Sequence, residues 1–210
     1  MSLLRGSGRR TAMLRRALRR RERTSPGGRA AHDARTRAAL ARPRAIVYTD
    51  TADFTRRAAR HGILHFMMVF DRAVRALGPA AARHHGRIVK VEADSLLLSF
   101  PDAERACLGV GAMDRALRRT NRGRPADERL RFSYGIGFGE VLDLEEDLFG
   151  LEVNLSSKLG EDLAHPGEVL LTPSAAEALP PATRRRLASY GVVDYGGRPI
   201  TVRRLRGMAR

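Results

Sequence analysis

Cysteine, aromatic residues and lysine are scarce in this sequence of 210 residues. It has one cysteine, no tryptophan and 5% aromatic residues. The lone Cys107 excludes an internal disulfide framework and any zinc site built on several cysteines, and it is typical of a reducing compartment. So few rings exclude a platform on which bases of single-stranded nucleic acid stack. Lysine occurs only at Lys90 and Lys158 among 39 basic residues, which favours a need for a compact cation at both positions.

Long apolar runs are also absent. Leu96-Leu97-Leu98 is about as hydrophobic as any segment becomes, whereas a membrane-spanning helix needs roughly 18 apolar residues. A secretory signal is not expected, because Arg5 follows Leu3-Leu4 before an apolar segment develops. With 43% hydrophobic and 30% charged residues, the composition is that of a globular protein. We therefore expect a cytoplasmic location.

The net charge of +16 comes mainly from the N-terminal end of the chain. Residues 1–44 contain fourteen arginines but only two acidic residues, Glu22 and Asp33, and so supply +12 of this charge. The remaining +4 is unremarkable for a folded domain. We therefore predict a basic, partly helical N-terminal extension at 1–44 and a separate folded domain at 45–210.

Within the extension, residues 11–24 predict a short basic amphipathic helix that ends at Ser25-Pro26-Gly27-Gly28. Its apolar face consists of Met13, Leu14, Ala17 and Leu18. Three interpretations stay open. The arginines contact an anionic membrane or nucleic acid, the segment is an organelle transit peptide, or it is a solvated helical extension without a partner.

From residue 45 onward, the hydrophobic pattern alternates between strands and helices. The predicted elements are a strand at 45–48, a long helix containing 63–77, strands at 86–92 and 95–100, a helix at 101–119 and a strand at 130–138. This βαββαβ order predicts a ferredoxin-like α+β sandwich. A helix near 153–163, a strand at 168–172, a short helical stretch and strands at 191–195 and 199–205 are predicted as C-terminal additions.

The predicted order of elements brings two aspartates together as a candidate metal site. Asp50 ends the first predicted strand, and Asp94 lies in the turn of the predicted hairpin. In a βαββαβ sheet the first strand lies beside this hairpin, so the two carboxylates can converge and hold a divalent cation. The alternative is that Asp50 or Asp53 caps the helix that begins near Phe54, and that Asp94 is an ordinary turn residue.

Several motifs, in order, resemble the catalytic (homology) domain of class III adenylate/guanylate cyclases, in a divergent bacterial-type branch. They are Tyr48-Thr-Asp50-Thr-Ala-Asp-Phe54-Thr55, Gly86-Arg-Ile-Val-Lys90-Val-Glu-Ala-Asp94-Ser-Leu-Leu-Leu-Ser-Phe100 and Asp147-Leu-Phe-Gly150-Leu-Glu-Val-Asn154-Leu-Ser-Ser-Lys158-Leu. The resemblance extends from about 45 to 180, and loosely to 205. It does not include the basic extension.

This resemblance implies a head-to-tail homodimer with composite active sites and two Mg²⁺ or Mn²⁺ ions. The metal ligands implied are the carboxylates of Asp50 and Asp94 and the carbonyl of Thr51. Lys90 and Asp147 match the positions that read adenine in adenylate cyclases, which implies ATP as substrate in preference to GTP.

The last of these motifs implies the two remaining site residues. Asn154 is implied to orient the ribose, so that its 3′-hydroxyl attacks the α-phosphate and expels pyrophosphate. Lys158 takes the place of the family's arginine that stabilises the transition state. The implied enzyme is an adenylate cyclase-like phosphorus–oxygen lyase in cyclic-nucleotide signalling.

The sequence departs from the family pattern at several positions. Besides Lys158, Ser133 stands where an arginine that contacts the triphosphate is common, Glu92-Ala93 replaces an Ile-Gly pair, and Asp53 replaces a glycine. These departures support an alternative function. The chain would then be a catalytically weak or inactive cyclase-homology domain that binds a nucleotide or a partner in signalling.

Overall fold

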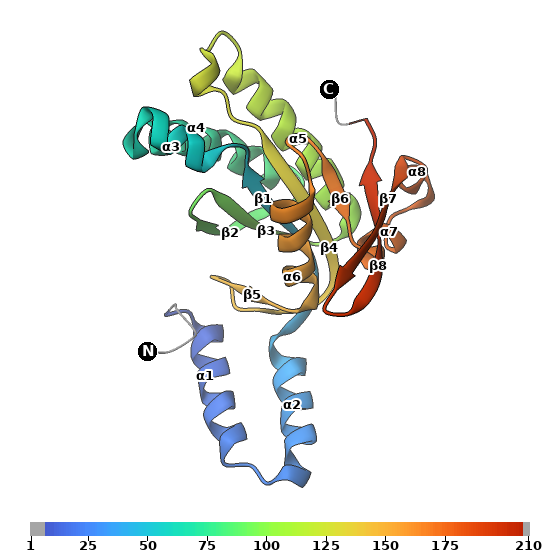
Figure 1. The fold of residues 1–210 in the computed structure, drawn as a ribbon. Coiled ribbons are helices and arrows are strands. Elements are labelled where there is room, and N and C mark those ends of the chain that lie inside the picture. Colours follow the sequence, from blue (N-terminus) through green and yellow to red (C-terminus); the bar gives the residue numbers. More distant parts are fainter. Residues whose placement is uncertain (1–6, 208–210) are drawn as a thin grey trace.

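The computed structural model describes residues 7–207, which form an α+β domain with a helical hairpin at its N-terminal end (Figure 1). One sheet has the strand order β2-β3-β1-β4-β6-β8-β7, with β5 paired to the end of β4. Its strands are β1 (Ala41–Thr51), β2 (Arg87–Glu92), β3 (Ser95–Phe100), β4 (Phe132–Asp143), β5 (Leu148–Phe149), β6 (Val169–Leu171), β7 (Leu187–Tyr195) and β8 (Arg198–Leu205). β4 and β6 run parallel, and the other pairs are antiparallel.

The helices lie on both faces of this sheet and in the hairpin. They are α1 (Arg9–Glu22), α2 (Pro26–Leu40), α3 (Phe54–His61), α4 (Ile63–Ala82), α5 (Ala103–Asn121), α6 (Leu151–Ser157), α7 (Pro173–Glu177) and α8 (Pro181–Arg184), with a 3₁₀ turn η1 (Ala126–Glu128) and a π-helical turn η2 (Lys158–Leu163). Within residues 7–207, no helix combines the length and the apolar composition needed to cross a bilayer.

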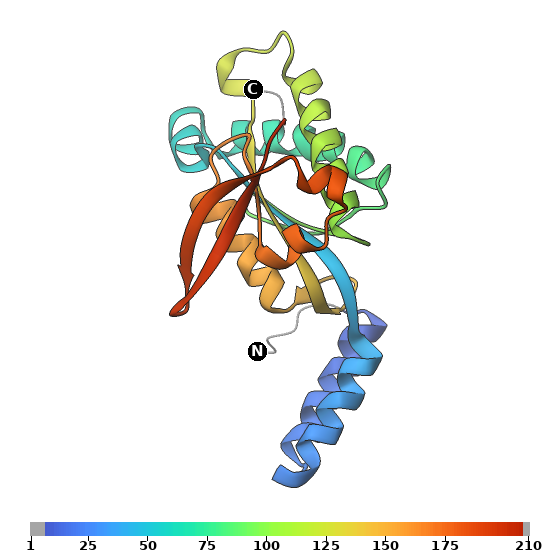
Figure 2. The same cartoon turned by 90° about the vertical axis from the view of Figure 1, so that its right-hand side faces the viewer.

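The predicted βαββαβ core is confirmed, and alternation along β1 explains its two layers. Ala45 and Val47 pack with the buried faces of α4 and α5, whereas Ile46 and Tyr48 pack with Val153 of α6. Because successive side chains of a strand point to opposite faces, Asp50 belongs to the α6 face. Figures 1 and 2 show α6 on the opposite side of the sheet from α4 and α5.

Two of the predicted helices are interrupted. The long helix after β1 is divided into α3 and α4 at Gly62, whose φ of 87° lies in the left-handed region that glycine adopts without strain. The predicted helix near 153–163 begins as α6 and continues as the π turn η2. Such π turns are frequent at functional sites.

Glycines allow α6 and η2 to pack unusually close to the sheet. A Cβ atom on Gly135 would lie 2.0 Å from the Ser156 carbonyl oxygen, and one on Gly160 would lie 2.6 Å from the Tyr48 carbonyl oxygen. No side chain fits at either position. The close approach brings the turn after α6 next to the end of β1.

The N-terminal extension is a helical hairpin of α1 and α2, which lie side by side and project from the domain (Figure 2). The predicted helix at 11–24 is confirmed as α1, but α2 was not predicted, and β1 begins at Ala41 inside the predicted extension. Arg10 attaches the hairpin to the domain by donating to the carbonyl of Asp143 at the end of β4, and it also donates to the carbonyl of Leu40 at the end of α2. Beside this contact, Leu14, Leu40 and Leu144 form a small apolar cluster. An anionic partner of the hairpin stays a prediction.

Candidate functional site

The candidate metal carboxylates lie together where β1 ends beside the β2–β3 turn. Thr49 pairs with Leu96, so Asp50 lies next to Ser95, the residue after Asp94. The Ser95 hydroxyl lies 3.2 Å from Asp50 Oδ1, and the Thr51 hydroxyl donates to Asp94 Oδ2 at 2.6 Å. The convergence that the βαββαβ order predicted for Asp50 and Asp94 is therefore present.

The electrostatics of this edge suit a cation. Burial, followed by the negative charge of Asp94, raises the pKa of Asp50 to about 6. Carboxylate and carbonyl oxygens are the donors that Mg²⁺ and Mn²⁺ prefer, so Asp50, Asp94 and the Thr51 carbonyl fit these ions by chemistry. As the side chains stand, no three His, Cys, Asp or Glu residues in 7–207 are close enough together to hold a metal ion.

The two residues matched to adenine recognition contact each other. Lys90 Nζ lies 3.3 Å from Asp147 Oδ2 and 2.5 Å from Glu92 Oε1. The hydrogen bond with Glu92 and the negative charges of both partners raise the pKa of Lys90 above its ordinary value. The pair presents a donor and an acceptor side by side, and Glu92, which the sequence analysis noted only as a departure from the family pattern, is a second acceptor.

Asn154 and Lys158 lie on α6 and at the start of η2. The Asn154 side chain is exposed, and the Lys158 ammonium forms an ion pair with Asp162 at 3.0 Å. The buried Glu152 fixes this helix to the sheet, because its carboxylate accepts from Phe138 N at 3.1 Å and from the Thr172 hydroxyl at 2.7 Å.

Ser133 does not replace the family's arginine as a phosphate contact. It lies opposite Asp50 on β4, is 5% exposed, and donates its hydroxyl to the Gly160 carbonyl at 2.7 Å. The hydroxyl is therefore part of the packing between β4 and η2. This position provides no cationic group for a triphosphate.

The two glycine replacements have left-handed backbones. Ala93 has φ of 49° in the β2–β3 turn, and Asp53 has φ of 67° at the start of α3. This region is sterically unfavourable for residues with a Cβ atom, and more so for alanine than for aspartate. The turn keeps the shape that a glycine would adopt there.

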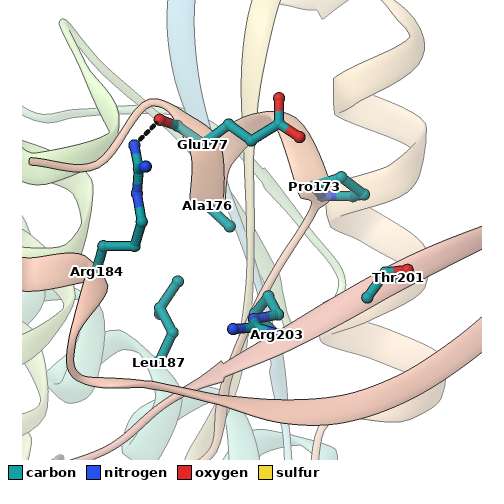
Figure 3. A pocket seen from close by; sticks show the side chains of 7 residues that line it. All are labelled: Pro173, Ala176, Glu177, Arg184, Leu187, Thr201 and Arg203. Carbon is teal, nitrogen blue, oxygen red and sulfur yellow. Dashed lines mark hydrogen bonds between the residues drawn. The ribbon is translucent and has the colours of Figure 1, made fainter. Parts of the chain in front are cut away.

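A pocket of about 240 Å³ lies far along the sheet from Asp50 and Asp94. It is lined by Pro173, Ala176, Glu177, Arg184, Leu187, Thr201 and Arg203 (Figure 3). This pocket belongs to α7, α8, β7 and β8, and β4 and β6 lie between β8 and β1. The pocket contains none of the predicted metal or base-reading residues.

The sequence analysis missed Glu161. Its Oε1 atom lies 3.5 Å from the same Ser95 hydroxyl that contacts Asp50, and its Oε2 atom accepts from the Ser157 hydroxyl. Glu161 follows the last motif residue by only a few positions, but nothing in helical periodicity places it beside Asp50, because the π turn changes its direction.

Comparisons with known proteins bear on the family and the fold of this chain. No family model matches the sequence. Putative adenylate cyclase 3 of Rhizobium meliloti (strain 1021) is 29% identical over 128 residues, which cover 61% of this chain and 22% of that protein. The chain thus matches about a fifth of this relative's length.

Solved structures show the same fold. An adenylate/guanylate cyclase/hydrolase from Silicibacter pomeroyi aligns with a TM-score of 0.64 and 26% identity, over 79% of this chain and 96% of that chain. The guanylyl cyclase Cya2 aligns with a TM-score of 0.67 and 23% identity, over 80% and 93% of the two chains. The chain therefore has the class III adenylate/guanylate cyclase fold, and the family resemblance predicted by its ordered motifs is confirmed.

Proposed function

We propose that this chain is a nucleotide cyclase that converts ATP to 3′,5′-cyclic AMP and pyrophosphate. The observation that carries the proposal is the contact of Lys90 with Asp147 on a domain whose Asp50 and Asp94 also converge. A Lys donor and an Asp acceptor complement adenine N1 and its amino group. Guanine reverses donor and acceptor at both points, which leaves groups unpaired at a cost of about 1–3 kcal/mol each.

In the proposed reaction the 3′-hydroxyl loses its proton to solvent water, its oxygen bonds to the α-phosphorus, and the bond from the α-phosphorus to the pyrophosphate oxygen breaks, which releases pyrophosphate. Asn154 orients the ribose for this in-line attack, and Lys158 neutralises charge on the α-phosphate in the transition state. Asp50, Asp94 and the Thr51 carbonyl would hold two Mg²⁺ or Mn²⁺ ions. When bound, these ions supply activation of the hydroxyl and neutralisation of the triphosphate.

We also propose that the active unit is a homodimer with composite sites. Lys90 contacts Asp147 and Glu92, whereas Asp50 and Asp94 contact Ser95 and Thr51. Within residues 7–207, no ion pair or side-chain hydrogen bond joins these two groups. In a two-fold dimer, the metal cluster of one copy faces the base-reading cluster of the other.

Product formation tests both proposals. We expect wild type to form cyclic AMP from ATP with Mn²⁺, and Asp50→Ala and Lys90→Glu alone to have little activity. In a mixture of the two variants, random pairing restores one intact site in half of the dimers, so activity returns to about a quarter of wild type. If wild type is active but the mixture recovers no activity, the composite site is wrong and the proposed cyclase activity stands.

A second candidate function is a homology domain that binds nucleotide without turnover. It is favoured by the buried Ser133, which leaves the triphosphate without that cation, and by the ion pair that engages Lys158. Nucleotide binding by wild type with no cyclic product from ATP or GTP would support this function and contradict the first.

A further inference from the structure

Glu161 lies at the edge of the sheet that carries the candidate metal carboxylates. Its carboxylate and that of Asp50 approach the same Ser95 hydroxyl, at 3.5 Å and 3.2 Å. A hydroxyl has one proton to donate, so it can satisfy only one of these two carboxylates at a time. The other is left beside a like charge.

The fold brings Glu161 to this place by close backbone packing. Gly160 lies against the Tyr48 carbonyl, where no Cβ atom fits, so the next residue along η2 emerges beside the end of β1. Asp50 points to the same face of the sheet by strand alternation. Glu161 is therefore directed to the metal edge by the backbone, and its side chain is exposed to solvent.

Charge at this edge is negative and uncompensated. Among residues 7–207, no lysine, arginine or histidine forms an ion pair with Asp50, Asp94 or Glu161. The partners of Glu161 are the neutral hydroxyls of Ser95, Ser157 and Tyr48. The neighbouring Asp162, in contrast, has the Lys158 ammonium as its partner.

We propose that Glu161 is a third carboxylate of the cation site, which turns from its hydroxyl partners toward Asp50 and Asp94 when a divalent cation binds. The inference rests on the metal site of the proposed function and adds a ligand to it. The additional negative charge also offers an explanation for Ser133, because a site richer in carboxylates holds its cations more strongly and relies less on an arginine for the triphosphate.

The test is Mn²⁺ binding to the full chain without nucleotide, measured by calorimetry on wild type, Glu161→Gln, Asp162→Asn and Asp50→Asn. Glu161→Gln removes the charge and keeps one carbonyl oxygen, which can accept from Ser95 or Ser157 in place of the two carboxylate oxygens that accept from both. Asp162→Asn is the matched control, because it removes the same charge one residue away. We expect Glu161→Gln and Asp50→Asn each to weaken binding about tenfold or more, and Asp162→Asn to change it less than about twofold.

The outcomes separate this inference from the proposed function. If Asp50→Asn weakens Mn²⁺ binding but Glu161→Gln does not, Glu161 is not part of the cation site, and the site itself stands. If Asp50→Asn has no effect, the metal site of the proposed function is wrong, and this inference falls with it. Glu161→Asp keeps the charge and should retain more Mn²⁺ affinity than Glu161→Gln; equal loss in both variants would show that packing, not charge, is responsible.

Discussion

The Lys90 ammonium lies 3.3 Å from the carboxylate of Asp147, although 57 residues separate them in the sequence. Lys90 is on β2, at one edge of the sheet, and Asp147 precedes β5, which pairs with the far end of β4. Two distant segments therefore place one donor and one acceptor side by side. In the function proposed above, this pair would read the adenine base.

Substrate choice should depend on this pair. Replacing Lys90 with Glu reverses a donor to an acceptor, so kcat/KM for ATP should fall about tenfold or more, from the loss of roughly 1–3 kcal/mol. The ratio of GTP to ATP turnover should rise. Steady-state assays with both nucleotides check this, and an unchanged ratio would show that Lys90 does not read the base.

The ion pair of Lys158 with Asp162 leads to a second prediction. Lys158→Arg supplies a planar fork with two donors for the α-phosphate, so kcat should rise about tenfold or more with little change in KM. Single-turnover rates of the two forms measure the effect. A drop in kcat would indicate that the site is built for the compact ammonium group.

The stability of the metal-free protein should depend on Asp50 and on pH. Burial and the charge of Asp94 raise its pKa from 3.8 to about 6, so the folded protein binds this proton more tightly than the unfolded chain does. The free energy of unfolding therefore falls as the pH rises from about 4 to about 6. Above that range Asp50 is ionised in the folded protein, and its full destabilising effect is present. Asp50→Asn should raise Tm in EDTA at pH 7.5 and leave it nearly unchanged below pH 4. A Tm for Asp50→Asn below that of wild type at pH 7.5 would contradict a destabilising repulsion between Asp50 and Asp94.

The left-handed backbone of Ala93 provides a fourth prediction. Ala93→Gly should stabilise the protein by about 1 kcal/mol, because glycine adopts positive φ without steric strain. Thermal unfolding should then shift upward by about 2–4 °C. The matched control is Ala112→Gly inside α5, which should destabilise the protein by about 1 kcal/mol. Destabilisation at both positions would show that the turn carries no strain.

The sequence predicted the parts of the fold that depend on local pattern. β3 and α5 have nearly the predicted bounds, because the short apolar run Leu96-Leu97-Leu98 and the Asp102 cap mark them clearly. The convergence of Asp50 with Asp94 followed from the topology alone. In contrast, α2 was missed, since Gly27 and Gly28 near its start resemble a linker, whereas Pro26 in fact occupies the first position of a helix.

What the sequence could not predict depends on tertiary packing. Glu161 reaches Asp50 through a π turn and two glycine contacts, and neither leaves a periodic signal. The burial of Ser133 follows from its pairing opposite Asp50 and from the approach of Gly160. Both features decide the charge of the site, and both are visible only when β1, β4 and η2 are placed together.

The most direct test of this account is the product formed from ATP by the full chain with Mn²⁺, compared between wild type and Asp50→Ala. The account predicts cyclic AMP and an equal amount of pyrophosphate from wild type, and neither from Asp50→Ala. The same cyclic AMP yield from both proteins would exclude Asp50 as a metal ligand. No cyclic AMP from wild type, with either Mn²⁺ or Mg²⁺, would contradict the cyclase assignment itself.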